Sequence, residues 1–107
     1  MSSEELTTMI IITVKSGSED KMREIAAYLT ESTNTNDEGC IYYAFHQQVD
    51  NPNMFVIFER WQNSNSLQAH LARLQDVYGP PAPGELFPPT LLELIEKFDI
   101  MQLQVIA

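Results

Sequence analysis

The hydrophobic residues of this chain recur in short runs, and the spacing within each run predicts an element. Residues 9–14 form a continuous, mostly β-branched run, which is typical of a strand covered on both faces. Residues 40–49 and 54–61 are rich in aromatic and β-branched residues and alternate, so we predict two further strands. Residues 98–106 alternate well enough to form a fourth strand. Residues 1–8 are expected to be a flexible tail.

A helical period separates the first two strands. Met22, Ile25, Ala26 and Leu29 form an apolar stripe, and Ser16 or Ser18 can cap its start. The polar residues 33–38 contain few helix formers, so we expect a connection there.

A second helix should run from a cap at Asn63 or Ser64 to about residue 74. Its leucines recur at helical spacing, and His70 falls on the same stripe. The imidazole should therefore point back towards the sheet. A pocket for an aromatic ligand could form there, although an ordinary core with a satisfied histidine explains the same pattern.

Five prolines lie between residues 79 and 89, which excludes a helix or a central strand there. The apolar residues among them indicate a lid loop packed over an opening. Thr90 and Glu93 have the spacing of a capping box, which predicts a short helix after the lid.

The second and third predicted strands, residues 40–49 and 54–61, are joined by Asp-Asn-Pro-Asn at residues 50–53, a sequence typical of a turn. If residues 51 and 52 are the two loop residues, Tyr43 pairs with Arg60 and both share one face of the sheet. Glu59 and Trp61 then lie on the other face. A register shift of one residue would exchange the two sets.

The predicted order is β-α-β-β-α, the lid, a short helix and β. This is the α+β, ferredoxin-like split-βαβ arrangement, with an antiparallel four-stranded sheet and helices on one face, in a single domain over residues 9–107. The strands carry apolar residues on both sides, so a second subunit is expected to cover the free face. A homodimer is therefore favoured over a monomer with an exposed apolar sheet.

Composition narrows the possible partners and compartments. The 107 residues carry a net charge of −9, which disfavours nucleic acid and anionic membrane surfaces as partners. No apolar run approaches the roughly 20 residues of a membrane span, and residues 1–5 are too acidic for a secretory signal. One cysteine and two histidines offer no disulfide and no zinc pattern. We expect a cytoplasmic protein.

Four motifs in order carry a resemblance to a known family. Residues 14–17 are similar to its Val-Lys-Pro-Gly, with Ser in place of Pro, and residues 37–43 are similar to its Glu-Pro-Gly-Cys-Leu-x-Tyr. Residues 50–61 resemble its Asp-x-Pro-x-x-Phe-x-x-x-Glu-x-Trp hairpin, and residues 67–70 resemble the end of its Ala-Leu-x-x-His helix. The chain thus resembles the antibiotic biosynthesis monooxygenase domain family, whose members are dimeric α+β barrels. Residues 75–97 diverge from it.

The resemblance implies a cofactor-independent monooxygenase that uses molecular oxygen on a small hydroxylated aromatic or quinol. Such electron-rich rings can reduce oxygen themselves once deprotonated, so the protein needs no metal, flavin or nicotinamide. No glycine-rich nucleotide loop is present. The haem-degrading branch of the family is disfavoured, because its Asn on the first strand is missing and His70 stands at its Trp position. One fold hosts several chemistries, so a non-enzymatic dimeric binding module for a small apolar ligand remains the alternative.

Four residues are candidates for the site. His70 would be the base or the hydrogen-bond partner of the substrate hydroxyl, Tyr43 and Arg60 would orient its oxygens, and Trp61 would wall or support the cavity. Each has a structural reading as well. His70 can cap a backbone carbonyl, Glu59 and Arg60 can form ion pairs at a dimer interface, and Trp61 can be an ordinary core residue.

Overall fold

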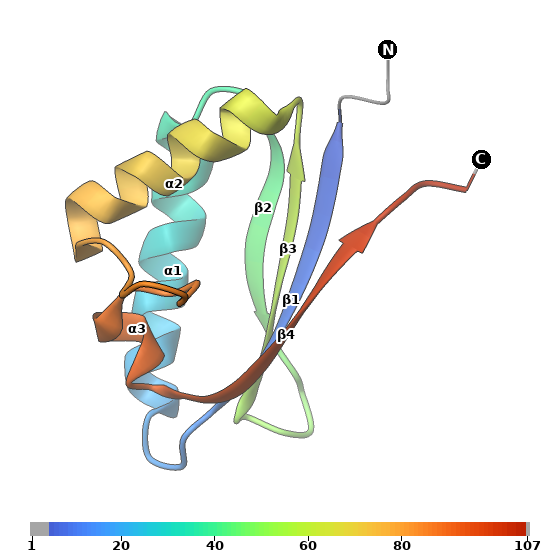
Figure 1. The fold of residues 1–107 in the computed structure, drawn as a ribbon. Helices are drawn as coiled ribbons and strands as arrows, with labels where there is room; N and C mark the ends of the chain where they lie inside the picture. Colours follow the sequence, from blue (N-terminus) through green and yellow to red (C-terminus); the bar gives the residue numbers. More distant parts are fainter. Residues whose placement is uncertain (1–4, 107) are drawn as a thin grey trace.

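The computed structural model describes residues 5–106, which form a four-stranded antiparallel sheet with helices on one face (Figure 1). The strands are β1 (Leu6–Val14), β2 (Cys40–Gln47), β3 (Met54–Trp61) and β4 (Ile95–Leu103). The helices are α1 (Glu19–Asn36), α2 (Ser64–Tyr78) and the four-residue α3 (Pro89–Leu92). The sheet order is β2-β3-β1-β4, so the predicted ferredoxin-like α+β fold is confirmed.

Strand β1 begins earlier than the sequence pattern predicts. Leu6 lies opposite Trp61 of β3, and Thr7 lies opposite both Arg60 of β3 and Leu103 of β4. The predicted tail is therefore too long, because pairing with β3 holds residues 6–8 in the sheet and β4 pairs with residues 7 and 8 from the other side. Residues 1–4 of that tail lie outside the described residues.

Helix α1 extends through residues 33–36, which were expected to form a connection. Thr33 is fully buried, and the side-chain amide of Asn34 donates from Nδ2 to the Tyr43 carbonyl oxygen at 2.7 Å. One turn earlier, the Thr30 hydroxyl accepts from the Phe45 amide at 3.1 Å. These contacts with β2 favour helix where intrinsic propensity does not. They also occupy backbone groups on the outer edge of β2.

The β2–β3 register differs from the predicted one by a single residue. Tyr43 lies opposite Glu59, not Arg60. The cause lies in the connection, which is longer than the two-residue loop assumed: it comprises residues 48–53, and the Gln48 amide donates to the Met54 carbonyl oxygen at 2.9 Å. Asn53 is fixed by its side chain, which donates to Glu19 Oε2 at 2.7 Å. Tyr43 and Glu59 therefore share the helix-covered face, and Arg60 lies on the other.

The C-terminal part keeps the predicted sequence of elements with shifted boundaries. The proline-rich segment has no regular structure, and the predicted capping box is wrong because α3 starts at Pro89 without a side-chain cap. Strand β4 starts at Ile95, three residues before the predicted Phe98, because Ile95 pairs with Val14 and the Lys15 amide donates to the Leu94 carbonyl oxygen.

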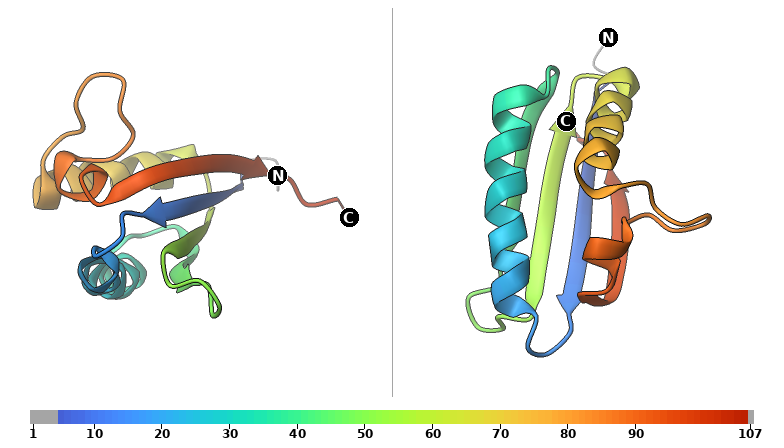
Figure 2. Two further views of the ribbon diagram at one scale, coloured as in Figure 1. Left: turned by 90° about the horizontal axis from the view of Figure 1, so that it is seen from below. Right: turned by 90° about the vertical axis from the view of Figure 1, so that its left-hand side faces the viewer.

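The core lies between the sheet and the helices, and the opposite side of the sheet has no helix over it among residues 5–106 (Figures 1 and 2). Alternation along the paired strands puts a set of apolar side chains on that uncovered side, which we call the open face. Its apolar members include Met9, Ile11, Val56, Phe58 and Met101, from β1, β3 and β4. Within the described chain, no helix is both long and apolar enough to cross a bilayer.

Candidate functional site

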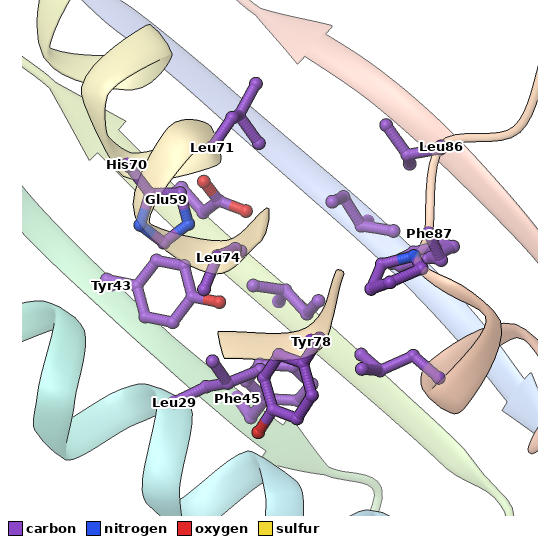
Figure 3. Close-up of a pocket in the computed structure, with 14 residues that line it drawn as sticks. Leu29, Tyr43, Phe45, Glu59, His70, Leu71, Leu74, Tyr78, Leu86 and Phe87 are labelled. Atoms are coloured by element: carbon purple, nitrogen blue, oxygen red, sulfur yellow. The ribbon is translucent and has the colours of Figure 1, made fainter. Parts of the chain in front are cut away.

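A small cavity lies between the sheet, α2 and the segment that leads into α3 (Figure 3). Most of its walls are apolar, with leucines from α1 and α2 on one side and Leu86, Phe87 and Leu91 on another. It offers about 70 Å³ to the centres of water molecules. That is room for a few waters, so a larger guest must push part of the wall aside.

One end of the cavity is polar. Figure 3 shows Tyr43 of β2, Glu59 of β3 and His70 of α2 gathered there, while Leu86 and Phe87 lie at the opposite side. All three polar side chains are at least 94 % buried, with exposed fractions of 3 %, 6 % and 2 %. Their convergence in an apolar cavity makes this the candidate site.

His70 is held from outside the cavity. Its Nδ1 lies 2.5 Å from Asp37 Oδ2, and a carboxylate can only accept, so Nδ1 carries the proton. Asp37 caps the end of α1, with its own amide donating to Thr33. Arg73, one turn after His70 on α2, donates from Nε to the other Asp37 oxygen at 2.5 Å. The end of α1 thus fixes the orientation of an imidazole on α2.

The charges in this cluster follow from burial and hydrogen bonding. Burial alone would raise the pKa of Asp37, but hydrogen bonds from Arg73 and His70 outweigh it and hold the pKa below its usual value. Burial lowers the pKa of His70, and the Asp37 carboxylate offsets only part of that effect. His70 is therefore neutral at neutral pH. With the proton on Nδ1, the lone pair on Nε2 remains free to accept a proton.

Glu59 is the residue that the sequence analysis did not place in the site. Alternation along β3 buries Phe55, Ile57, Glu59 and Trp61 on the helix-covered face. The Trp61 indole Nε1 donates to Glu59 Oε1 at 2.9 Å. Burial raises the pKa of Glu59, and the Trp61 hydrogen bond limits the rise. The alternation itself was visible in the sequence, and a correct register would have joined Glu59 to Tyr43.

Aromatic packing fixes the polar end of the cavity. The His70 ring lies 4.7 Å from the Trp61 ring and 5.1 Å from the Tyr43 ring, centroid to centroid. Burial and the nearby carboxylates raise the pKa of Tyr43 well above its usual value, so its hydroxyl stays protonated. Trp61 is fully buried behind His70 and does not line the cavity.

Arg60 is not brought to this site. It lies on the opposite side of the sheet, where its Nη2 and Nε donate to Glu5 Oε1 at 2.5 and 3.1 Å. The structure thus brings together His70, Tyr43 and Trp61 and separates Arg60 from them. The described residues contain no group of three or more His, Cys, Asp or Glu side chains arranged to hold a metal ion.

A family model described as antibiotic biosynthesis monooxygenase matches residues 6–75, from β1 into α2. The chain belongs to this family. The match contains Tyr43, Glu59, Trp61 and His70, and it ends before the proline-rich segment. Membership associates the chain with monooxygenase-like or oxidoreductase-like chemistry at the level of the family, without a specific substrate.

Solved structures support the same fold assignment. A protein of Pseudomonas aeruginosa is 22 % identical, with a TM-score of 0.77 over 100 % of this chain and 99 % of its own. A putative antibiotic biosynthesis monooxygenase of Bacteroides thetaiotaomicron is 9 % identical, with a TM-score of 0.83 over 100 % of this chain and 94 % of its own. A second protein of that organism is 25 % identical, with a TM-score of 0.70 over 94 % of this chain and 98 % of its own. No protein of curated function matches this family member.

Proposed function

We propose that this protein is a homodimeric, cofactor-independent monooxygenase that oxidises a small hydroxylated aromatic ring or quinol in the cavity beside His70. Membership of the antibiotic biosynthesis monooxygenase family supports the reaction class. The 25 %-identical structure from Bacteroides thetaiotaomicron is itself described as a possible oxidoreductase.

The observation that carries the proposal is the state of His70. A neutral imidazole whose Nδ1 proton is bonded to Asp37 has its Nε2 lone pair available, and His70 lines an apolar cavity. A base held in this way can take the proton of a substrate hydroxyl. The Tyr43 hydroxyl is a protonated donor in the same cavity, so it can stabilise the oxyanion that forms.

The chemistry balances without another reductant. Proton transfer to His70 Nε2 leaves a phenolate, which passes one electron to oxygen and gives a ring radical and superoxide. Their combination forms a carbon–oxygen bond, and loss of water leaves the second oxygen atom in the product. A quinol and one O₂ thus give a hydroxyquinone and one H₂O, and the substrate supplies all the electrons. The protein contributes the base, the oxyanion donor and a dry cavity.

The homodimer is proposed from the open face. Three adjacent strands of the open face carry apolar side chains, and the described chain has no helix to cover them. These side chains include Met9, Ile11, Val56, Phe58 and Met101. A contiguous apolar patch on a sheet usually marks an interface. A second copy of the chain is the economical partner, because the same patch can cover itself around a two-fold axis.

Oxygen uptake by the purified protein with a panel of quinols, anthrones and naphthols tests the oxygenase. We expect uptake above the spontaneous rate, and we expect His70→Ala to lose it while it still binds the substrate. Gln68→Ala is the matched control, since Gln68 is an exposed residue on the same helix. Uptake that survives in His70→Ala would remove His70 from the mechanism. Binding without uptake by any compound would favour a non-enzymatic binding module.

A further inference from the structure

The cavity has two chemically different ends, and the second end lies outside the residues that match the family model. Tyr43, Glu59 and His70 lie at the polar end, within the residues that match the family model. Leu86, Phe87, Pro88 and Leu91 form the apolar end, and all four lie beyond residue 75. The residues that match the family model therefore supply the polar groups, while the segment that follows them supplies the opposite wall.

The wall formed by residues 86–91 also contains the mouth of the cavity. Leu86 lines the cavity and is nevertheless 40 % exposed, whereas the next residue, Phe87, is 7 % exposed and packs edge-on against Phe98 at 5.0 Å. A ligand bound at the polar end would thus reach solvent past Leu86, with Phe87 as a fixed surface beside it. Both ribbon views in Figure 2 show the preceding residues as a loop that projects from the body.

The loop before Leu86 makes few backbone hydrogen bonds that would resist its displacement. Between Pro80 and Phe87, the described chain forms a single backbone hydrogen bond, from the Glu85 amide to the Ala82 carbonyl oxygen. Gly79 precedes this stretch and Gly84 lies within it, with φ angles of 82° and 83°. A segment with so few hydrogen bonds to its surroundings opens at low cost. Such opening is required, because the cavity as it stands holds only a few waters.

The lining also limits the charge of a ligand. Among the described residues that form the cavity there is no Lys or Arg, and Glu59 is acidic. A carboxylated or phosphorylated substituent would find no counterion there and would be repelled by Glu59. An uncharged apolar substituent meets matching surface at Leu86, Phe87 and Leu91.

We infer that the ligand is a hydroxylated ring with an uncharged apolar substituent: the ring lies at the His70 end and the substituent lies along Leu86 and Phe87. This inference rests on the proposed function, because it takes the polar end as the place of the ring. It assigns substrate selection to Leu86 and its neighbours, outside the residues that carry the chemistry.

Binding of three resorcinols tests the inference. Resorcinol, 4-hexylresorcinol and 2,4-dihydroxybenzoate share a dihydroxylated ring and differ in having no tail, an apolar tail or a charge. The single tryptophan, Trp61, packs on His70, so its fluorescence can report occupancy of the polar end. Burial of each CH₂ favours binding about fourfold, so we expect 4-hexylresorcinol to bind at least about tenfold tighter than resorcinol. The benzoate should bind most weakly.

Two variants locate the tail. Leu86→Ser should weaken the binding of 4-hexylresorcinol at least about threefold and leave the affinity for resorcinol unchanged. Glu85→Gln is the control, since Glu85 is exposed on the same loop and does not line the cavity. Equal affinity for the two uncharged compounds, or a tail advantage that survives in Leu86→Ser, would overturn the inference. A tail preference without oxygen uptake from any hydroquinone would keep the inference and refute the oxygenase.

Discussion

The Asp37 carboxylate and the His70 imidazole, 33 residues apart in sequence, meet at 2.5 Å behind the cavity. Arg73 donates to the same carboxylate, so one buried acid at the end of α1 holds two side chains of α2. The orientation of the proposed base therefore depends on the way α1 ends.

Asp37→Asn should impair both folding and activity. The amide removes the negative charge that Arg73 and His70 share, so we expect the free energy of unfolding to fall by about 1–3 kcal/mol. Oxygen uptake should fall at least about tenfold, because the imidazole is no longer held in one tautomer. Glu38→Gln removes the same charge at the exposed neighbouring residue and serves as the control. If urea unfolding and oxygen uptake were the same for both variants, Asp37 would have no role in positioning His70.

The low pKa of His70 predicts a loss of stability in mild acid. Below the usual pKa of 6.5 the histidine of the unfolded chain binds a proton, whereas His70 of the folded protein stays neutral. Stability should therefore fall as the pH drops from 6.5 towards the lower pKa of the folded protein. Urea unfolding at pH 7.5 and 5.5 measures the fall. His70→Gln should show a smaller fall than the wild type, and an equal fall in the two proteins would assign the effect to other groups.

Glu59→Gln should stabilise the protein at neutral pH. The raised pKa means that folded Glu59 releases its proton at a higher pH than the unfolded chain does, so stability declines as the pH rises above 4.5. Gln cannot ionise, and its amide oxygen can still accept from Trp61. We expect a gain of about 1 kcal/mol at pH 7 that disappears near pH 4. Thermal unfolding at the two pH values checks this, and a less stable variant at pH 7 would show that the carboxylate has a partner of its own.

Gly39→Ala and Gly17→Ala form a matched pair of substitutions. Both glycines have φ angles in the left-handed region, 81° and 93°, so each alanine should cost about 1 kcal/mol in backbone strain. A Cβ at Gly39 would also overlap the Ser66 side chain, whereas nothing lies within 4 Å at Gly17. We expect Gly39→Ala to lose about 2 kcal/mol more than Gly17→Ala in chemical denaturation. Equal losses would mean that Ser66 can move away freely.

Phe58→Asp tests the proposed dimer. A charge at the centre of the open face would be desolvated by a second copy, so we expect sedimentation to change from a dimer to a folded monomer. Val49→Asp is the control, because Val49 is equally apolar, 96 % exposed and located in the β2–β3 loop. A wild type that sediments as a monomer at tens of micromolar would refute the dimer directly.

Much of the fold follows from local patterns that the sequence displays. A continuous apolar run predicted β1, alternating runs predicted β2, β3 and β4, and the helical stripe placed His70 inward, where it is 2 % exposed. These patterns work because burial on one face repeats with the geometry of the element itself. The boundaries were less predictable: residues 33–36 are helical because Thr33 and Asn34 pack on β2, which local propensity does not report.

The site was only partly predictable, because two of its determinants are tertiary. The β2–β3 register goes with a connection of residues 48–53, in which the Asn53 side chain is bonded to Glu19 on α1, and the two-residue loop assumed from the sequence placed Arg60 on the face of Tyr43. The Asp37–His70 contact joins two helices that no sequence spacing relates. His70 could therefore be found from its stripe, but its partner could not.

The bonds from Thr30 and Asn34 to β2 leave the sheet with unequal edges. Strand addition needs unpaired backbone groups, and α1 already occupies such groups at Phe45 and Tyr43 on one edge. On the described chain, the other edge is β4, which has no neighbouring strand beyond it. Two copies that joined through β4 would each present their occupied β2 edge outward. A further strand could pair with that edge at Tyr43 and Phe45 only by displacing their hydrogen bonds with α1.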